Sequence, residues 1–226
     1  MEHEAEFTTE KISERKINID YEKPEPSLHM FASMANTRDE IVCDSSVRIR
    51  LYLETFIDYL LHDENFKYDV SSWDKEIFLL SAQLHDIGKL AVADNILNKV
   101  GKLSEDDYET IKSHAKFGIE VVEQLKESVD DDNLLLHAES MVGSHHEKWD
   151  GTGYPQGLKG TQIPLQGRIM SIVDVYYALT SDRPHRKKKS HEEAIEIITE
   201  GKGTDFDPDL VDVFLECAKD FAERKN

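Results

Sequence analysis

The chain has 226 residues, 39% of them hydrophobic, which is enough for one large domain with its own core. Acidic residues outnumber basic ones by 46 to 27, for a formal net charge of −19, and a chain this negative repels nucleic-acid backbones. The acidic first residues lack the apolar core of a signal peptide, no apolar run approaches the ~20 residues that span a membrane, and two cysteines, Cys43 and Cys217, suggest a reducing compartment. Composition therefore predicts a cytoplasmic protein with no nucleic-acid partner and no membrane insertion.

The first part of the chain differs from the rest. Residues 1–36 are polar, contain Pro24 and Pro26 and show no sustained period, which predicts a leader or linker. From residue 37 to residue 226, apolar residues recur at helical spacing, and no segment shows the alternation of a strand. We therefore expect residues 37–226 to form one all-α domain, a multi-helix bundle.

The predicted helices follow one another with recognisable boundaries. Their approximate ranges are 38–62, 72–86, 104–127, 132–146, 165–181 and 190–200, with a last helix that begins at residue 208. Ser104 followed by Asp107, and Ser190 followed by Glu193, have the spacing of capping boxes at two helix starts. The stretches 90–102 and 149–160 are predicted to be irregular; the second of these is rich in glycine.

The doublet His85-Asp86 stands at the end of the second predicted helix. Ile77 and Leu84 lie on one helical stripe before it, and Gly88 after it allows the backbone to turn away. At a helix end, two adjacent side chains can converge on one point, which suits a metal or a phosphate. For the doublet alone, a helix C-cap with a surface histidine is the commoner explanation.

Further candidate ligands stand at the ends or inner edges of other predicted helices. Asp174 lies between two valines in an apolar helix and His145 lies on an apolar stripe, where an unpartnered carboxylate or imidazole would be costly. Each has a structural explanation when taken alone, such as a hydrogen-bonded core histidine or an aspartate paired with Arg168. Together, on four predicted helices, they favour a metal site between helices. The full set is His85, Asp86, His114, His145, His146 and Asp174.

Two motifs of this sequence resemble those of a known family. The first is His85-Asp86-Ile87-Gly88-Lys89, and the second runs from His145-His146-Glu147 to Asp150-Gly151-Thr152-Gly153-Tyr154-Pro155. They resemble the two signatures of HD-GYP domains, the phosphodiesterases of the HD superfamily that cleave cyclic di-GMP. The resemblance extends from about residue 38 to the end. It implies an HD-domain helical bundle and a metal-dependent cyclic dinucleotide phosphodiesterase.

The resemblance also implies two divalent metal ions. Asp86 would bridge them, His85 and Asp174 would hold one ion, and the three remaining histidines of the set would hold the other. A mixed imidazole and carboxylate set suits Fe or Mn in octahedral geometry. Two such ions can activate a water molecule and stabilise an in-line displacement at phosphorus.

The same resemblance assigns roles toward the substrate, cyclic di-GMP. Asp86 and Lys89 would be catalytic, with Lys89 also facing a phosphate oxygen. Arg183 would clamp a phosphate, and Tyr154 would help to position the substrate. The lysines after Arg183 are more simply explained as a solvated turn.

The chain departs from the family pattern in the first helix. The family usually has a glutamate and, four residues later, a histidine, where this chain has Ile41 and Ser45. The resemblance therefore implies two ions rather than three, with one site weakened, and hydrolysis to linear pGpG more than onward to GMP.

Two alternatives stay open at this point. The missing ligands are compatible with a weak or inactive module that acts as a cyclic-dinucleotide sensor or as a scaffold for a cyclase or another signalling protein. The substrate can also be a different cyclic dinucleotide, because base recognition depends on the shape of the pocket. A homodimer is left open as well.

Overall fold

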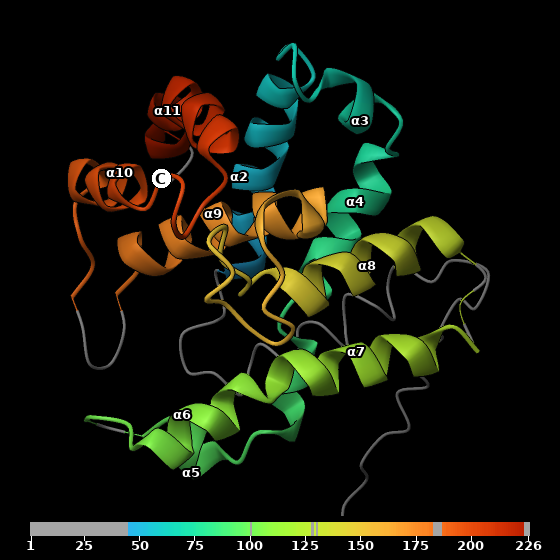
Figure 1. Cartoon of the computed structure of the whole chain (residues 1–226), viewed down its shortest axis with the longest axis vertical. Helices are drawn as coiled ribbons and strands as arrows, with labels where there is room; N and C mark the ends of the chain where they lie inside the picture. Colours follow the sequence, from blue (N-terminus) through green and yellow to red (C-terminus); the bar gives the residue numbers. More distant parts are fainter. Residues whose placement is uncertain (1–44, 100, 128, 130, 183–186, 224–226) are drawn as a thin grey trace, which may run out of the picture.

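A computed structural model describes residues 45–99, 101–127, 129, 131–182 and 187–223 (Figure 1). The predicted leader, Ile41 and Arg183 lie outside the described residues. Within those ranges every regular element is a helix, and the single β-bridge, between Lys202 and Phe206, is isolated. The prediction of an all-α bundle is confirmed. In the same ranges, no helix combines the length and the apolar character needed to cross a membrane.

The helices of the described residues differ in length: five have 12 residues or more and the others are shorter. The long helices are α2 (Ser45–Leu60), α7 (His114–Leu125), α8 (Asp132–Ser144), α9 (Leu165–Thr180) and α11 (Pro208–Glu223). The shorter ones are α3 (Lys67–Ser71), α4 (Lys75–Ser81), α5 (Asp94–Leu97), α6 (Glu105–Lys112) and α10 (His191–Glu200), with the 3-10 turns η1 (Ala82–Leu84), η2 (Ile87–Ala91) and η3 (Gly160–Gln162).

The predicted helix starts are confirmed where a cap marks them. Asp107 N–H donates to Ser104 Oγ at 3.1 Å while Ser104 N–H donates to the Asp107 carboxylate at 2.8 Å, and Ser190 with Glu193 repeats this capping box before α10. Each such cap stabilises its helix by about 1 kcal/mol. These hydrogen bonds join residues three positions apart, so their spacing in the sequence is enough to predict them.

Several elements differ from the prediction. The helix expected over 104–127 is divided at Ser113 into α6 and α7; Ser113 keeps helical dihedral angles, and its hydroxyl donates to the Thr110 carbonyl at 2.6 Å. The helix expected over 72–86 begins at Lys75 as α4 and tightens into η1 before the doublet. Helix α5 lies in a stretch predicted to be irregular; at four residues it is too short to show a period.

The helices enclose two apolar cores, and α4, α8 and η1 contribute to both. The larger core joins α2, α9, α10 and α11, and its centre is aromatic: the rings of Tyr52 and Phe221 stack at 4.9 Å, with Tyr176 edge-on to Tyr52 at 5.1 Å. The smaller core joins η1 and η2 to α7 and α8. Because η1 and η2 belong to the smaller core, the doublet between them is held against α7 and α8.

Candidate metal centre

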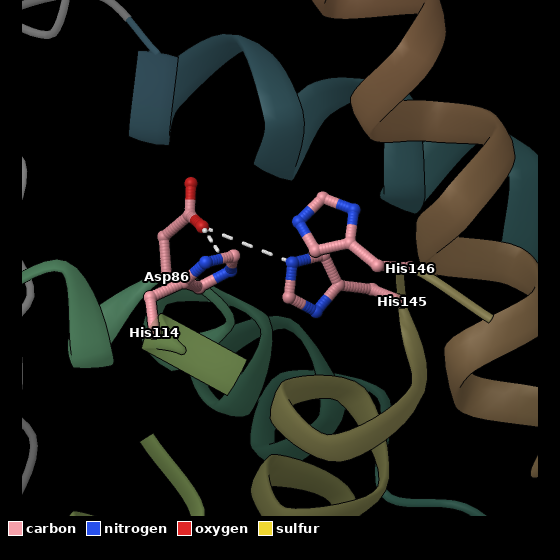
Figure 2. A group of neighbouring side chains, drawn as sticks. All are labelled: Asp86, His114, His145 and His146. Atoms are coloured by element: carbon pink, nitrogen blue, oxygen red, sulfur yellow. Dashed lines mark ion pairs between the residues drawn. The ribbon is translucent and has the colours of Figure 1, made fainter. Parts of the chain in front are cut away.

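Four of the six predicted ligands lie together. Asp86 comes from the link between η1 and η2, His114 is the first residue of α7, and His145 and His146 follow the last turn of α8. One ligand atom from each of the four lies within 4.8 Å of the others, as Figure 2 illustrates. We call this group the ligand cluster. Its members come from three segments, so only the tertiary fold brings them together.

Gly88 allows η2 to approach α7 closely. A Cβ atom at this position would lie 1.9 Å from the His114 carbonyl oxygen and 2.5 Å from the Gly118 nitrogen. The expectation that Gly88 serves to turn the backbone is therefore incomplete. Its lack of a side chain is what allows the segment carrying Asp86 to pack against the start of α7.

Three of the histidine rings are oriented by the same kind of hydrogen bond. The Nδ1 atoms of His85, His114 and His145 each lie 2.6–2.8 Å from the backbone carbonyl oxygen three or four residues earlier. With the Nδ1 proton donated to that carbonyl, Nε2 keeps its lone pair and can bind a metal. In the described part of the chain, the Nε2 atoms of His114 and His145 are buried without any hydrogen-bond partner. Buried, unpartnered nitrogens that face a carboxylate fit a metal ion.

The two carboxylate oxygens of Asp86 face two different groups of residues. Oδ1 lies 3.4 Å from Nε2 of His114 and 3.8 Å from Nε2 of His145, the two contacts drawn in Figure 2. Oδ2 points the other way and lies 3.2 Å from Nε2 of His85 and 2.6 Å from Nζ of Lys89. A carboxylate placed in this way can contact ions on both of its sides.

The electrostatics of the cluster favour an ionised Asp86 and neutral rings at His114 and His146. Burial opposes the charge on Asp86, but the neighbouring Lys89 and His85 lower the pKa of its carboxyl well below the usual range. Burial lowers the pKa of His146 well below its ordinary value and that of His114 to about 4. Burial also acts on His85, yet the charge and hydrogen bond of Asp86 raise its pKa overall. At neutral pH the cluster therefore offers the Asp86 carboxylate and the neutral rings of His114 and His146.

The remaining predicted residues surround the cluster. Asp174 of α9 is half-buried and outside the group of four, but its charge contributes to raising the pKa values of both His85 and Tyr154. The ring of Tyr154 stacks on His146, with centroids 4.8 Å apart and 27° between the planes.

The start of α2 lies beside His85. Ser46 and Ile49 line a small cavity of about 10 Å³ together with His85. Apart from His85, none of the described residues lining this cavity is an imidazole or a carboxylate. Ser45, at the position where the family has a histidine, is the first residue of α2.

Glu147 organises the glycine-rich loop, and the sequence analysis assigned it no role. Its carboxylate is buried and accepts hydrogen bonds from three backbone N–H groups, those of Gln156 at 2.7 Å, Gly157 at 3.1 Å and Leu158 at 3.0 Å. This folds the loop back against the segment that carries His146, and so places Tyr154 on the ligand cluster. The signal in the sequence was an acid directly before a loop whose glycines leave backbone N–H groups exposed.

The sequence and the fold match known proteins. A family model described as HD domain matches residues 31–210. A probable cyclic di-GMP phosphodiesterase of Vibrio cholerae is 40% identical over 185 residues, which are 81% of this chain and 42% of that protein. A 3′3′-cGAMP-specific phosphodiesterase 2 of the same organism is 32% identical over 208 residues, 91% of this chain and 37% of that protein. The chain thus spans about two fifths of the length of these relatives.

Two solved structures share the fold. A cyclic GMP-AMP-specific phosphodiesterase of V. cholerae, V-cGAP3, has a TM-score of 0.58 at 19% identity, over 88% of this chain and 51% of that one. Bd1817, an HDGYP protein from Bdellovibrio bacteriovorus, has a TM-score of 0.54 at 18% identity, over 88% and 66%. With the HD doublet and the glycine-rich motif both at the ligand cluster, the chain belongs to the HD domain family, in its HD-GYP branch.

Proposed function

We propose that this chain is a metal-dependent phosphodiesterase that opens cyclic di-GMP to linear pGpG. The observation that carries the proposal is the pair of buried, unpartnered Nε2 atoms of His114 and His145, which face one oxygen of Asp86. Relatives named as cyclic di-GMP phosphodiesterases, 35–40% identical to this chain, support the substrate.

Two divalent ions, Fe or Mn, would be held on the two sides of Asp86. With Asp86 shared between them, His114, His145 and His146 would hold one ion, and His85 and Asp174 would hold the other. Imidazole and carboxylate donors suit these metals. When bound, such a pair of ions polarises the phosphodiester and lowers the pKa of an attacking water.

The protein's own cations complete the site. The Lys89 ammonium donates to Asp86 at 2.6 Å, which places it at the ligand cluster, where a phosphate oxygen would lie near it. There it would oppose the negative charge that develops as the phosphate is attacked. Arg183 would hold a phosphate, and Tyr154, fixed on His146, would position the substrate.

The expected reaction product depends on two residues of the first predicted helix. With Ile41 and Ser45 in place of the family's glutamate and histidine, the set supports two ions and a first site completed in part by water or phosphate. We therefore expect one phosphodiester bond to be cut, giving pGpG rather than rapid release of GMP.

An anaerobic experiment tests the proposal. The chain is loaded with Fe or Mn, its metal content is measured, and the products from cyclic di-GMP are separated by chromatography. pGpG should accumulate with the wild-type protein and be absent with Asp86→Asn. Rapid formation of GMP would contradict the proposed product. A fully loaded protein without turnover would favour the sensor or scaffold alternative.

A further inference from the structure

A pocket of about 190 Å³ lies next to the ligand cluster. Tyr154 belongs to both: it lines the pocket, and its ring stacks on His146 at 4.8 Å. Only the ring of Tyr154 would therefore separate a molecule bound at the cluster from this pocket. The lining residues are Glu109, Lys112, Ser113, Lys116, Tyr154 and Pro155.

Two lysines form one side of this pocket. Lys112 ends α6 and Lys116 lies in the first turns of α7, and the backbone between them stays helical, with Ser113 at φ −61° and ψ −18°. Residues four apart on a helical path lie on the same side, so the two ammonium groups face the pocket together. Nζ of Lys112 lies 5.4 Å from the centroid of the Tyr154 ring and 4.8 Å from that of Tyr108.

The charges of this pocket favour an anion. Glu109, the one carboxylate lining it, accepts a hydrogen bond from Lys112 at 2.7 Å, which leaves two of the three ammonium donors of Lys112. Lys116 is exposed and is paired with no carboxylate in the described ranges. In a chain with a net charge of −19, two lysines at the edge of the candidate active site give a local field of the opposite sign.

We propose that this pocket binds the second, uncleaved phosphate of the cyclic dinucleotide, with Lys112 and Lys116 as its partners. The inference rests on the proposed function. A cyclic dinucleotide carries two phosphates in one ring, and when one is at the ligand cluster the other must lie a short distance away. The ring of Tyr154 lies between these two positions, with His146 stacked on it and the Lys112 ammonium over it.

The test compares two substrates that differ in their number of phosphates. Cyclic di-GMP has two, whereas bis(p-nitrophenyl) phosphate has one and needs only the ligand cluster. For the double variant Lys112→Ala/Lys116→Ala we expect KM for cyclic di-GMP to rise about tenfold with kcat retained, because charge-assisted hydrogen bonds to phosphate are lost. Hydrolysis of bis(p-nitrophenyl) phosphate should be unchanged. Lys219→Ala, an exposed lysine of α11, is the matched control and should change neither.

The other possible results distinguish a failure of this inference from a failure of the proposed function. An equal change for both substrates, or no change for either, would overturn the inference while leaving the phosphodiesterase proposal intact. If the wild-type protein does not hydrolyse cyclic di-GMP, the proposed function fails, and calorimetric binding of cyclic di-GMP then decides on the pocket. A tenfold weaker Kd in the double variant supports it; equal binding, or no binding by the wild-type protein, overturns it.

Discussion

Substituting Gly88 by alanine tests whether close packing of η2 on α7 builds the ligand cluster. The new methyl group would lie 1.9 Å from the His114 carbonyl oxygen and 2.5 Å from the Gly118 nitrogen. Both are backbone atoms and cannot rotate away. Restoring an ordinary contact of about 3.5 Å requires the two segments to separate by roughly 1.6 Å.

That separation acts directly on the cluster, because Asp86 precedes Gly88 by two residues and His114 is the residue that clashes. The 3.4 Å approach of Asp86 to His114 would widen, and one of the two would no longer reach a shared ion. We expect a loss of about 1–3 kcal/mol in the free energy of unfolding from overpacking. We also expect Mn²⁺ affinity to fall by about 10–100-fold, the range seen when the support of a metal ligand is removed.

Gly143→Ala is the matched control for this variant. It also adds a methyl group to a glycine near the cluster, but its nearest neighbour is the end of the Ile119 side chain at 3.2 Å, which can move. Calorimetric titration with Mn²⁺ and thermal unfolding followed by circular dichroism should separate the two variants. Wild-type metal affinity in Gly88→Ala would refute the reasoning, even if the melting temperature fell.

Three further predictions follow from buried polar groups. Glu147→Ala leaves three backbone N–H groups of the loop without their acceptor and should lower the free energy of unfolding by about 2–4 kcal/mol in urea denaturation, whereas Glu147→Gln should cost less because it keeps an acceptor oxygen. Asp207→Asn removes the charge that pairs with Arg168 at 2.5 Å in a buried site, and differential scanning calorimetry should record a loss of about 3–5 kcal/mol; an unchanged melting temperature would contradict this. Burial lowers the pKa of His137 below its ordinary 6.5, so the unfolded chain binds the proton more tightly than the folded chain. The free energy of unfolding should therefore fall as pH drops from about 7 to about 5. The fall should be less steep in His137→Gln with the same metal content.

The sequence predicted those features of this fold that depend on near neighbours in the chain. The capping boxes at Ser104 and Ser190 join residues three apart, and both are present. The contact of Gly88 with α7 and the hydrogen bonds of Glu147 with residues nine to eleven positions later depend on how distant segments pack. No periodicity encodes such contacts, so these two residues could be noticed in the sequence but not explained by it.

The structure explains how a histidine that follows a helix end can be oriented as a candidate ligand. Carbonyl groups in the last turn of a helix can accept a further hydrogen bond from a histidine ring that follows. The carbonyls of Ile111, in the last turn of α6, and of Met141, in the last turn of α8, accept the Nδ1 protons of His114 and His145. The Met141 carbonyl also accepts the backbone N–H of His145 at 3.0 Å.

The division at Ser113, which the periodicity did not predict, lies directly before His114 of the ligand cluster. α6 ends at Lys112, two residues before His114, and the Ile111 carbonyl in its last turn lies 2.6 Å from Nδ1 of that ring. With the Nδ1 proton on that carbonyl, Nε2 of His114 faces Asp86 at 3.4 Å. The apolar stripe of the segment predicts neither contact.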